Sequence, residues 1–466
     1  MVFSSSVFIF FFLSFVLLIY FLLKKRSHRN NFLVVMSLIF YGWGAPWLLI
    51  VMMGSITVNW LLGLLIAGSE GDEKRRKFLL VITVIFNIGL LSYYKYLPFV
   101  LKNINWLFHT NFPEGTFELL GISFFTFQAM SYVIDVYRHE AKMQKNILNV
   151  CLYVSLFPQL IAGPIVRYQT VADEIEERHE NIEEFNAGAR RFMVGLAKKT
   201  LLANNLALLA NDAFALPASE LSVAAAWLGA IAYLWQVYFD FSGYSDMAIG
   251  MGWMFGFHFE ENFIFPMVSK SITEFWRRWH ISLGTWFRDY LFFPLGGSRC
   301  SHRRAIFNMF VVWSLTGLWH GAKWTYVIWG IGFFVLLVLE KYTPLGKWMD
   351  THPIGHLYAM VAMTTVTVII RSDDMAQAIK YIGTMYGAGS AGLFNSTALM
   401  YLREYGLFVL AGIVVSLPVG EFIQRSLHIP ENTMQLLRGA GLVLAIFVSF
   451  SYIIMGGYNP FIYANF

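Results

Sequence analysis

The feature that most constrains this chain is a series of long apolar runs, many of them close to 20 residues in length. A helix needs about 20 predominantly apolar residues to cross a bilayer, because the hydrocarbon core is about 30 Å thick. Transmembrane β-barrels instead show alternating strands of roughly 10 residues. The runs therefore predict an all-α polytopic membrane protein. Candidate spans are 6–23, 32–66 (two helices broken near Gly44 to Pro46), 78–97, 147–163, 223–256, 305–322, 324–340, 354–370, 404–424 and 437–456.

The composition supports this fold class. Apolar residues make up 57% of the 466 residues and charged residues only 14%, whereas soluble domains carry about 25% charged residues. This excludes a soluble globular enzyme, a disordered chain and a nucleic-acid-binding module. The two cysteines, Cys151 and Cys300, cannot form a disulfide framework. With the shorter stretches 119–136 and 188–210, we expect about 11–13 transmembrane or re-entrant helices in a single domain spanning 1–466.

The distribution of basic residues predicts the orientation of the chain. Basic residues follow the first apolar run at 24–29 and return at 74–77, so by the positive-inside rule both loops are expected to be cytoplasmic and the N-terminus external. Lys198 and Lys199 are interpreted as another cytoplasmic basic cluster. The charged run 173–184 is interpreted as a solvated surface helix.

Polar residues inside the apolar segments indicate where chemistry takes place, since ionisable side chains at membrane depth are costly. One cluster runs from Tyr238 to Asp246, and a second from Asn262 to Asp289. On a helical wheel, the charged residues of 274–289 share one face and the aromatic residues the other. We therefore expect an amphipathic interfacial helix there, with Glu274 paired to Arg277 or Arg278.

Two histidines lie in or beside these clusters. His280 falls on the margin of the aromatic face, where partial desolvation favours its neutral form; a purely structural histidine is an equal alternative. His320 ends an apolar helix in the sequence Leu318-Trp319-His320-Gly321. A lone apolar histidine is usually structural, but two of them near buried polar residues favour a reaction chamber. We expect no metal, because no carboxylate or cysteine lies at ligand spacing from either histidine.

Two segments carry a resemblance to a known family. ITEFWRRWHISLGTWFRDYLFFPLGG at 272–297 and LTGLWHGAKWTYVIWG at 315–330 resemble the membrane-bound O-acyltransferase (MBOAT) superfamily, in its bacterial alginate O-acetyltransferase branch. The likeness continues at 121–138, 156–168 and 236–266. The motif-bearing core is thus about 1–340, and 341–466 supplies C-terminal transmembrane helices together with a family-like end at 459–466.

The resemblance implies a helical bundle around a tunnel, with His320 at the position of the catalytic histidine and His280 at that of the second motif histidine. Other matching motif positions are expected to line the substrate site or tunnel, without a distinct role for each. They are Asp240, Tyr244, Asp246, Asn262, Trp276, Arg277, Arg278, Asp289 and Trp319.

The function implied is a bacterial inner-membrane O-acetyltransferase without a bound cofactor. It would take an acetyl group from a cytoplasmic donor, acetyl-CoA, and move it across the membrane. The acetyl group would then be transferred to an extracytoplasmic polysaccharide such as alginate, either directly or by an SGNH-type partner transferase. Within the family, peptidoglycan, cellulose or another wall polymer, or D-alanyl transfer to teichoic acid, are alternatives. A polysaccharide exporter or flippase, and a non-catalytic scaffold, are alternatives of other classes. We expect the protein to contact membrane lipid and to have no nucleic-acid partner.

Overall fold

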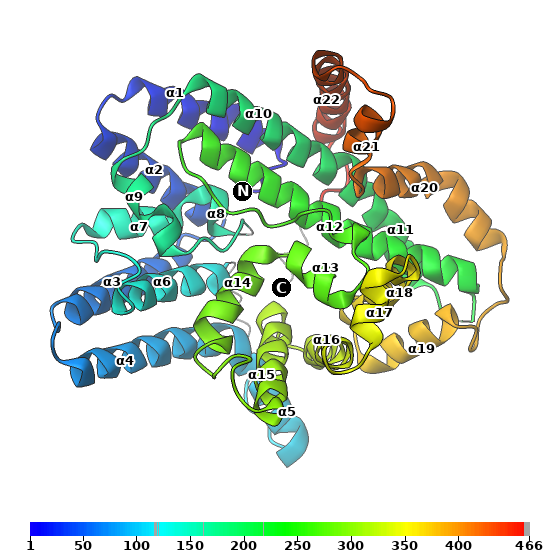
Figure 1. Cartoon of the computed structure of the whole chain (residues 1–466), viewed down its shortest axis with the longest axis horizontal. Coiled ribbons are helices and arrows are strands. Elements are labelled where there is room, and N and C mark those ends of the chain that lie inside the picture. The colour runs from blue at the N-terminus through cyan, green and yellow to red at the C-terminus, as the bar shows by residue number, and fades with distance from the viewer. Residues whose placement is uncertain (116–118, 120, 162, 218, 461–466) are drawn as a thin grey trace. The chain divides into compact units, whose positions relative to one another are not determined.

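The computed structural model describes residues 1–115, 119, 121–161, 163–217 and 219–460 (Figure 1). These residues form helices, and an isolated antiparallel bridge between Phe263 and Trp279 is the only extended pairing described among them. The all-α prediction is confirmed. The chain divides into two compact units, Met1–Phe192 with Ser245–Glu260, and Met193–Tyr244 with Glu261–Phe466. The single-domain expectation stays a prediction, and each unit is described by itself.

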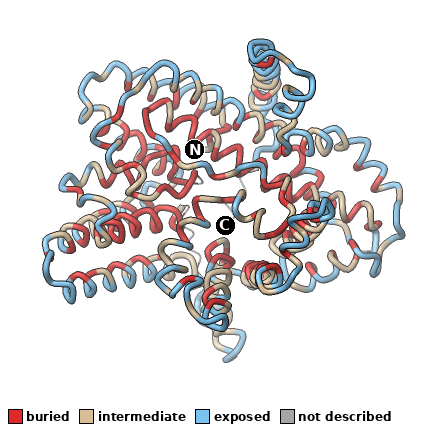
Figure 2. The backbone as a smooth tube through the Cα atoms, viewed as in Figure 1, coloured by how far each residue is buried: buried red, intermediate tan, exposed pale blue. Residues whose placement is uncertain are grey.

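The first unit contains the N-terminal helices. α6 is buried along most of its length (Figure 2), whereas α4 exposes apolar side chains such as Phe78 and Ile85. The helices are η1 (Val7–Leu13), α1 (Ser14–Leu22), α2 (Arg26–Gly42), α3 (Leu48–Ala67), α4 (Glu73–Leu91), η2 (Ser92–Tyr96), α5 (Leu97–Phe108), α6 (Ile122–Tyr137), α7 (Ile147–Ser155), α8 (Phe157–Leu160) and α9 (Tyr168–Glu176).

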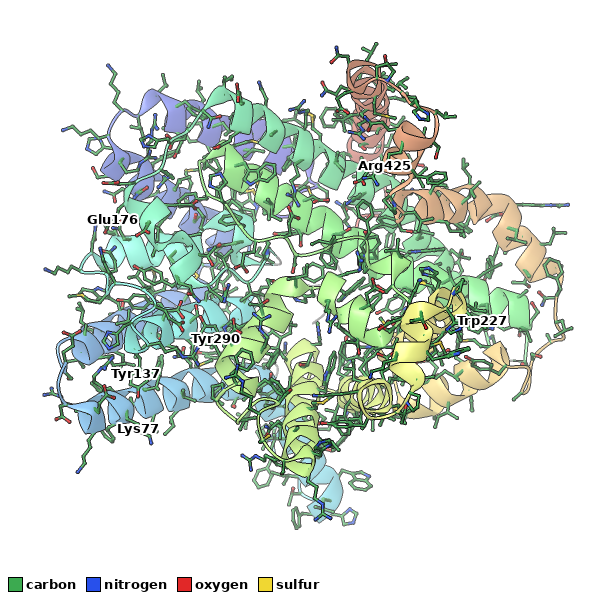
Figure 3. The ribbon with its side chains drawn as sticks, viewed as in Figure 1. Lys77, Tyr137, Glu176, Trp227, Tyr290 and Arg425 are labelled. Carbon is green, nitrogen blue, oxygen red and sulfur yellow. The ribbon has the colours of Figure 1, made fainter. Side chains whose placement is uncertain are left out.

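The second unit contains the C-terminal helices, and α10 (Ile182–Ala197) and α12 (Val223–Met254) contribute to both units. Trp227 of α12, labelled in Figure 3, donates its indole N–H to the carbonyl of Met385 at 2.8 Å. The other helices are η3 (Lys198–Ala203), α11 (Asn204–Ala215), η4 (Pro266–Val268), α13 (Ile272–Arg278), α14 (Ile281–Phe287), η5 (Arg288–Phe292), α15 (His302–His320), α16 (Trp324–Tyr342), α17 (Leu345–Thr351), α18 (Ile354–Arg371), α19 (Met375–Met385), α20 (Ser396–Val415), α21 (Val419–Ser426) and α22 (Glu431–Ile454).

Several helices have the length and surface of membrane spans, so the chain is a multi-pass membrane protein. Among the described residues, six helices are long and apolar enough: α3, α4 continued through α5, α16, α18, α20 and α22. On α22, Val443 and Phe447 are 70% and 71% exposed. Apolar faces of this extent require lipid or another apolar cover.

Some predicted spans differ from the helices. The break near Gly44 to Pro46 is confirmed, since α2 ends at Gly42 and α3 begins at Leu48. The span at 147–163 is wrong: α7 ends at Ser155, because Leu156 leaves the helical region with ψ 114° and Pro158 has no N–H to continue the ladder. The span placed at 404–424 is shifted, because α20 begins at Ser396 and ends at Val415.

Most residues of the charged run 173–184 are exposed, as predicted, but the run is not one helix, since α9 ends at Glu176 and α10 begins at Ile182, and two of its charged side chains are largely buried. The side chains of Arg178 and Glu180 are 1% and 9% exposed, and Glu180 forms ion pairs with Arg26 and Arg29. Tyr20 also donates to Glu180. Burial acts to raise the pKa of Glu180, but hydrogen bonds from Arg26 and Tyr20 and the charge of Arg26 outweigh it and lower that pKa to about 2. This cluster ties the N-terminal helices of the first unit to the loop before α10.

Candidate functional site

His280 lies at a break between two short helices. The continuous amphipathic helix predicted over 274–289 is wrong, since α13 ends at Arg278 and α14 begins at Ile281. The break arises because residues 262–264 pair with the chain there. Ile264 donates its N–H to the Arg278 carbonyl at 2.9 Å, and Ile281 to that of Asn262 at 3.1 Å.

The backbone at the break is unusual. His280 has φ 45° and ψ 51°, in the left-handed region that non-glycine residues seldom occupy and that costs roughly 1–2 kcal/mol. A helix continuing through this position would avoid that cost. The strained conformation therefore requires the surrounding contacts, and its result is to turn the imidazole into the interior, where the residue is 1% exposed.

Asn262 holds the imidazole in one orientation. Its Oδ1 accepts hydrogen bonds from His280 Nδ1 at 3.1 Å, Ser282 N at 3.2 Å and Ser282 Oγ at 2.9 Å. Because an amide oxygen only accepts, this arrangement assigns the proton of neutral His280 to Nδ1 and leaves a lone pair on Nε2.

His280 Nε2 is buried and has no hydrogen-bond partner among the described residues. Burial, together with the charge of nearby His320, lowers the pKa of His280 well below its ordinary range. The ring of Phe241 contacts the imidazole edge to face, with 4.5 Å between ring centroids. His280 is therefore a neutral base with an unused acceptor atom, and the sequence expectation of a neutral imidazole agrees with this geometry.

His320 ends α15, close to His280. The two ring centroids are 6.3 Å apart. The ring of His320 lies 5.0 Å from that of Trp319 and 5.2 Å from that of Trp329, centroid to centroid. The structure thus brings together the two histidines that the sequence singled out, and both belong to the second unit.

Glycines bring α15 and α16 close enough to form this arrangement. A Cβ on Gly317 would lie 2.3 Å from the carbonyl oxygen of Tyr326, and a Cβ on Gly330 would lie 2.3 Å from that of Trp313. No real Cβ tolerates such distances. Small residues at these two positions therefore set the distance between the helices and hold His320 against Trp329.

Two cavities meet at Trp276, which lines both. The larger, about 300 Å³, is lined by His280, and its polar residues include Arg288, Ser298 and Lys341. The smaller, about 40 Å³, is lined by His320 and by apolar and aromatic residues. Each histidine thus faces its own cavity, and the indole of Trp276 lies at the boundary between the two.

The residues predicted around the histidines have different positions. Trp319 is buried, with its ring 6.0 Å from that of His280. Arg278 pairs with Glu274 at 2.9 Å, as predicted from their spacing, while Arg277 is exposed. Asp289 pairs with its neighbour Arg288 at 2.8 Å.

None of the residues of the predicted polar cluster 238–246 lines either of the two cavities. Asp240 forms an ion pair with Lys199 at 2.6 Å, and both side chains are 3% exposed. Tyr244, one turn later, is buried. Asp246 belongs to the first unit, where it pairs with Arg191 at 3.0 Å.

Sequence reasoning misplaced Lys199 and missed Glu340. Lys199 is buried, so it does not lie in an exposed basic loop, and the cytoplasmic location of the cluster stays a prediction. The carboxylate of Glu340 accepts from Ile272 N at 2.7 Å, from Thr273 N at 2.8 Å and from Thr273 Oγ1 at 2.6 Å. It therefore fixes the start of α13, the helix that carries Trp276. A single carboxylate near the end of an apolar run was the signal that could have revealed it.

No group of three or more His, Cys, Asp or Glu side chains in the described part of the chain is arranged to hold a metal ion. The site thus combines the unpartnered acceptor nitrogen of His280 with two cavities.

Comparison with known proteins places these residues in a family context. The model of the membrane-bound O-acyltransferase family matches residues 39–387. The probable alginate O-acetylase AlgI of Pseudomonas putida is 37% identical over the full length of both chains. The peptidoglycan O-acetyltransferase of Helicobacter pylori is 30% identical, covering 93% of this chain and 91% of the relative. The teichoic acid D-alanyltransferase of Bacillus subtilis is 30% identical over 53% of this chain and 66% of the relative.

Proposed function

Because the chain belongs to the membrane-bound O-acyltransferase family and is an acyltransferase, we propose that it transfers acetyl groups from cytoplasmic acetyl-CoA, through the membrane, to the hydroxyls of an extracytoplasmic polysaccharide. The observation that carries the proposal is the pair of imidazoles 6.3 Å apart between two cavities. Similarity over the whole chain to a probable alginate O-acetylase supports acetyl as the group transferred and alginate as the polymer.

In the proposed reaction, His320 is the general base. It accepts the proton of the attacking hydroxyl as the oxygen bonds to the acetyl carbonyl carbon, and the carbon–sulfur bond of the thioester then breaks. The departing thiolate takes up a proton, so the products are an acetyl ester and free thiol. An imidazole suits this step because its ordinary pKa of about 6.5 lies near neutral pH.

His280 orients the reactants in this proposal. Its Nε2 lone pair is buried, and Asn262 fixes the ring. That nitrogen is placed to accept a hydrogen bond from a donor that enters the site, such as the acceptor hydroxyl. Because desolvation keeps His280 neutral, it does not repel the proton that His320 gains.

The larger cavity is proposed to hold the arm of the acyl donor. It is mostly apolar near His280, while Arg288 and Lys341 supply cationic groups that suit the phosphates of CoA. This places the thioester near the histidines with the rest of the donor beside the basic groups.

The site of action is proposed to be the bacterial inner membrane, with an SGNH-type transferase receiving the acetyl group outside before it reaches the polymer. Two other acceptors remain candidates because of specific relatives. The H. pylori relative, similar over 93% of this chain, favours peptidoglycan as the second candidate. D-alanyl transfer has less support, since that relative matches only about half of the chain.

Membrane vesicles from the native bacterium test the donor and the direction. Radiolabelled acetyl-CoA is supplied to the cytoplasmic face in inside-out vesicles and to the outer face in right-side-out vesicles. We expect label in alkali-labile esters of the polymer only in the first case, and none when the gene is deleted. Equal labelling from the outer face would contradict transfer from the cytoplasmic side. Label found in peptidoglycan alone would show that peptidoglycan, and not alginate, is the acceptor polymer.

A further inference from the structure

The smaller cavity beside His320 is a small chamber whose walls come from five helices, α12, α13, α15, α16 and α18. Its volume is about 40 Å³. A buried water needs ~10–15 Å³ of such space, so the chamber holds on the order of three water-sized groups. An acetyl group has three heavy atoms, two carbons and one oxygen. The chamber therefore matches an acetyl group in size.

The lining of the chamber is apolar apart from His320 and a few hydroxyl and indole groups. Of the ten residues described around it, none carries a carboxylate. Met363, Thr367 and Ile370 are contributed by α18, and Leu234 and Val237 by α12. An ammonium group placed here would have no anion to pair with and would be costly to desolvate.

Trp276 lines both the chamber and the larger cavity, whereas His320 lines only the chamber and His280 only the larger cavity. The larger one contains Arg288 and Lys341 and suits the phosphate-bearing arm of the donor. Once that arm occupies the larger cavity, the acyl chain beyond the thioester carbonyl extends toward His320. The space available for it there is the 40 Å³ chamber.

We propose that this chamber is the acyl pocket, and that Met363 and Ile370 limit the transferred group to two carbons. The proposal rests on the proposed function and adds the size and charge of the cargo. Met363 is 3% exposed and belongs to the buried core, so the wall that it forms cannot easily move aside. Longer acyl groups would overfill the chamber, and a D-alanyl group would bring a third carbon and an unpaired ammonium.

The test compares acetyl-, propionyl-, butyryl- and D-alanyl-CoA as donors in native membranes that carry each variant. The readout is the ratio of each transferred acyl group to acetyl, measured as labelled ester. In the wild-type protein we expect butyryl transfer at least 100-fold below acetyl, since each additional methylene in a fitted pocket changes the rate about 10- to 200-fold. D-alanyl transfer should be at least as low.

Met363→Ala removes three heavy atoms from the wall, more than the two carbons by which butyryl exceeds acetyl. We expect it to raise the butyryl-to-acetyl ratio at least tenfold. The matched control is Met360→Ala, the same change on the same helix, at a half-buried residue that does not line the chamber. It should leave the ratio unchanged, as should Met363→Leu, which keeps most of the volume.

Ile370→Val removes one methyl group and is the milder variant if Met363→Ala does not fold. It should raise the propionyl-to-acetyl ratio severalfold. Efficient butyryl or D-alanyl transfer by the wild-type protein would overturn the inference, as would unchanged ratios in folded chamber variants. Absence of any acetyl transfer from acetyl-CoA by the wild-type protein would instead refute the proposed function, and the inference with it.

Discussion

The ion pair between Lys199 and Asp240 gives the sharpest prediction about stability. The charged atoms are 2.6 Å apart and both side chains are 3% exposed. At an effective dielectric constant of about 20, the Coulomb attraction at this distance is ~6 kcal/mol, and the cost of desolvating both charges opposes it. Lys199 also donates to the carbonyl of Pro460. Lys199→Met removes one charge, and we expect it to destabilise the protein by about 3–5 kcal/mol.

The assay is thermal unfolding of the detergent-solubilised protein, followed as the loss of the monodisperse chromatographic peak. Lys199→Met should lower the apparent Tm by several degrees, and Asp240→Leu in the same chain should recover much of the loss because no unpaired charge then remains. The control is Arg425→Met, which breaks an exposed pair with Glu421 and should cost under ~1 kcal/mol. Equal effects of Lys199→Met and Arg425→Met would refute the reasoning.

Three further predictions concern other buried polar contacts. Glu340→Gln weakens the hydrogen bonds at the start of α13 and should cost about 1–2 kcal/mol, measured as a lower apparent Tm. Asn262→Ala releases His280 Nδ1 and should slow acetyl transfer up to ~100-fold in a folded protein, because the imidazole loses the contact that orients it. The lowered pKa of Glu180 contributes stability that is fully present above pH ~4.5 and is lost as pH falls toward 2. A series of Tm measurements across this pH range should show the loss, and the decrease in Tm should be smaller in Glu180→Gln.

The composition and the long apolar runs were sufficient to predict the membrane class and the helical fold. They also placed α3, α16 and α18 to within a few residues, because apolar length directly reflects the thickness of the bilayer. The short, interrupted segments were harder. The division of 147–163 depends on Pro158 and on a turn at Leu156, and hydropathy alone does not resolve such a turn.

The site was partly predictable. The histidines were identified because ionisable groups in apolar surroundings are rare, and their motifs resemble a known family. The helical wheel placed the aromatic residues Phe275 and Trp286 opposite the charged face, and both are buried. It failed at His280, because pairing of residues 262–264 with that segment is a tertiary contact that overrides helical periodicity.

The residues that sequence reasoning misplaced or missed form contacts with partners that are distant in sequence. Lys199 is 41 positions from Asp240, and Glu340 is 68 positions from Ile272. Because Lys199 follows another lysine, the sequence pattern there is that of an exposed basic loop. Only the ion pair with Asp240 reveals that Lys199 is buried. The chamber beside His320 depends on Met363 and Ile370, in a segment whose sequence is apolar and carries no recognised motif.

The central claim is that His320 is the base for acetyl transfer, and one measurement tests it most directly. Acetyl transfer from labelled acetyl-CoA to polymer is compared between wild-type and His320→Ala proteins at equal amounts of folded protein in the membrane. His302→Ala, at the other end of α15, is the matched control and should retain full activity. We expect His320→Ala to lower transfer at least 100-fold. Transfer at the wild-type rate by folded His320→Ala would contradict the account.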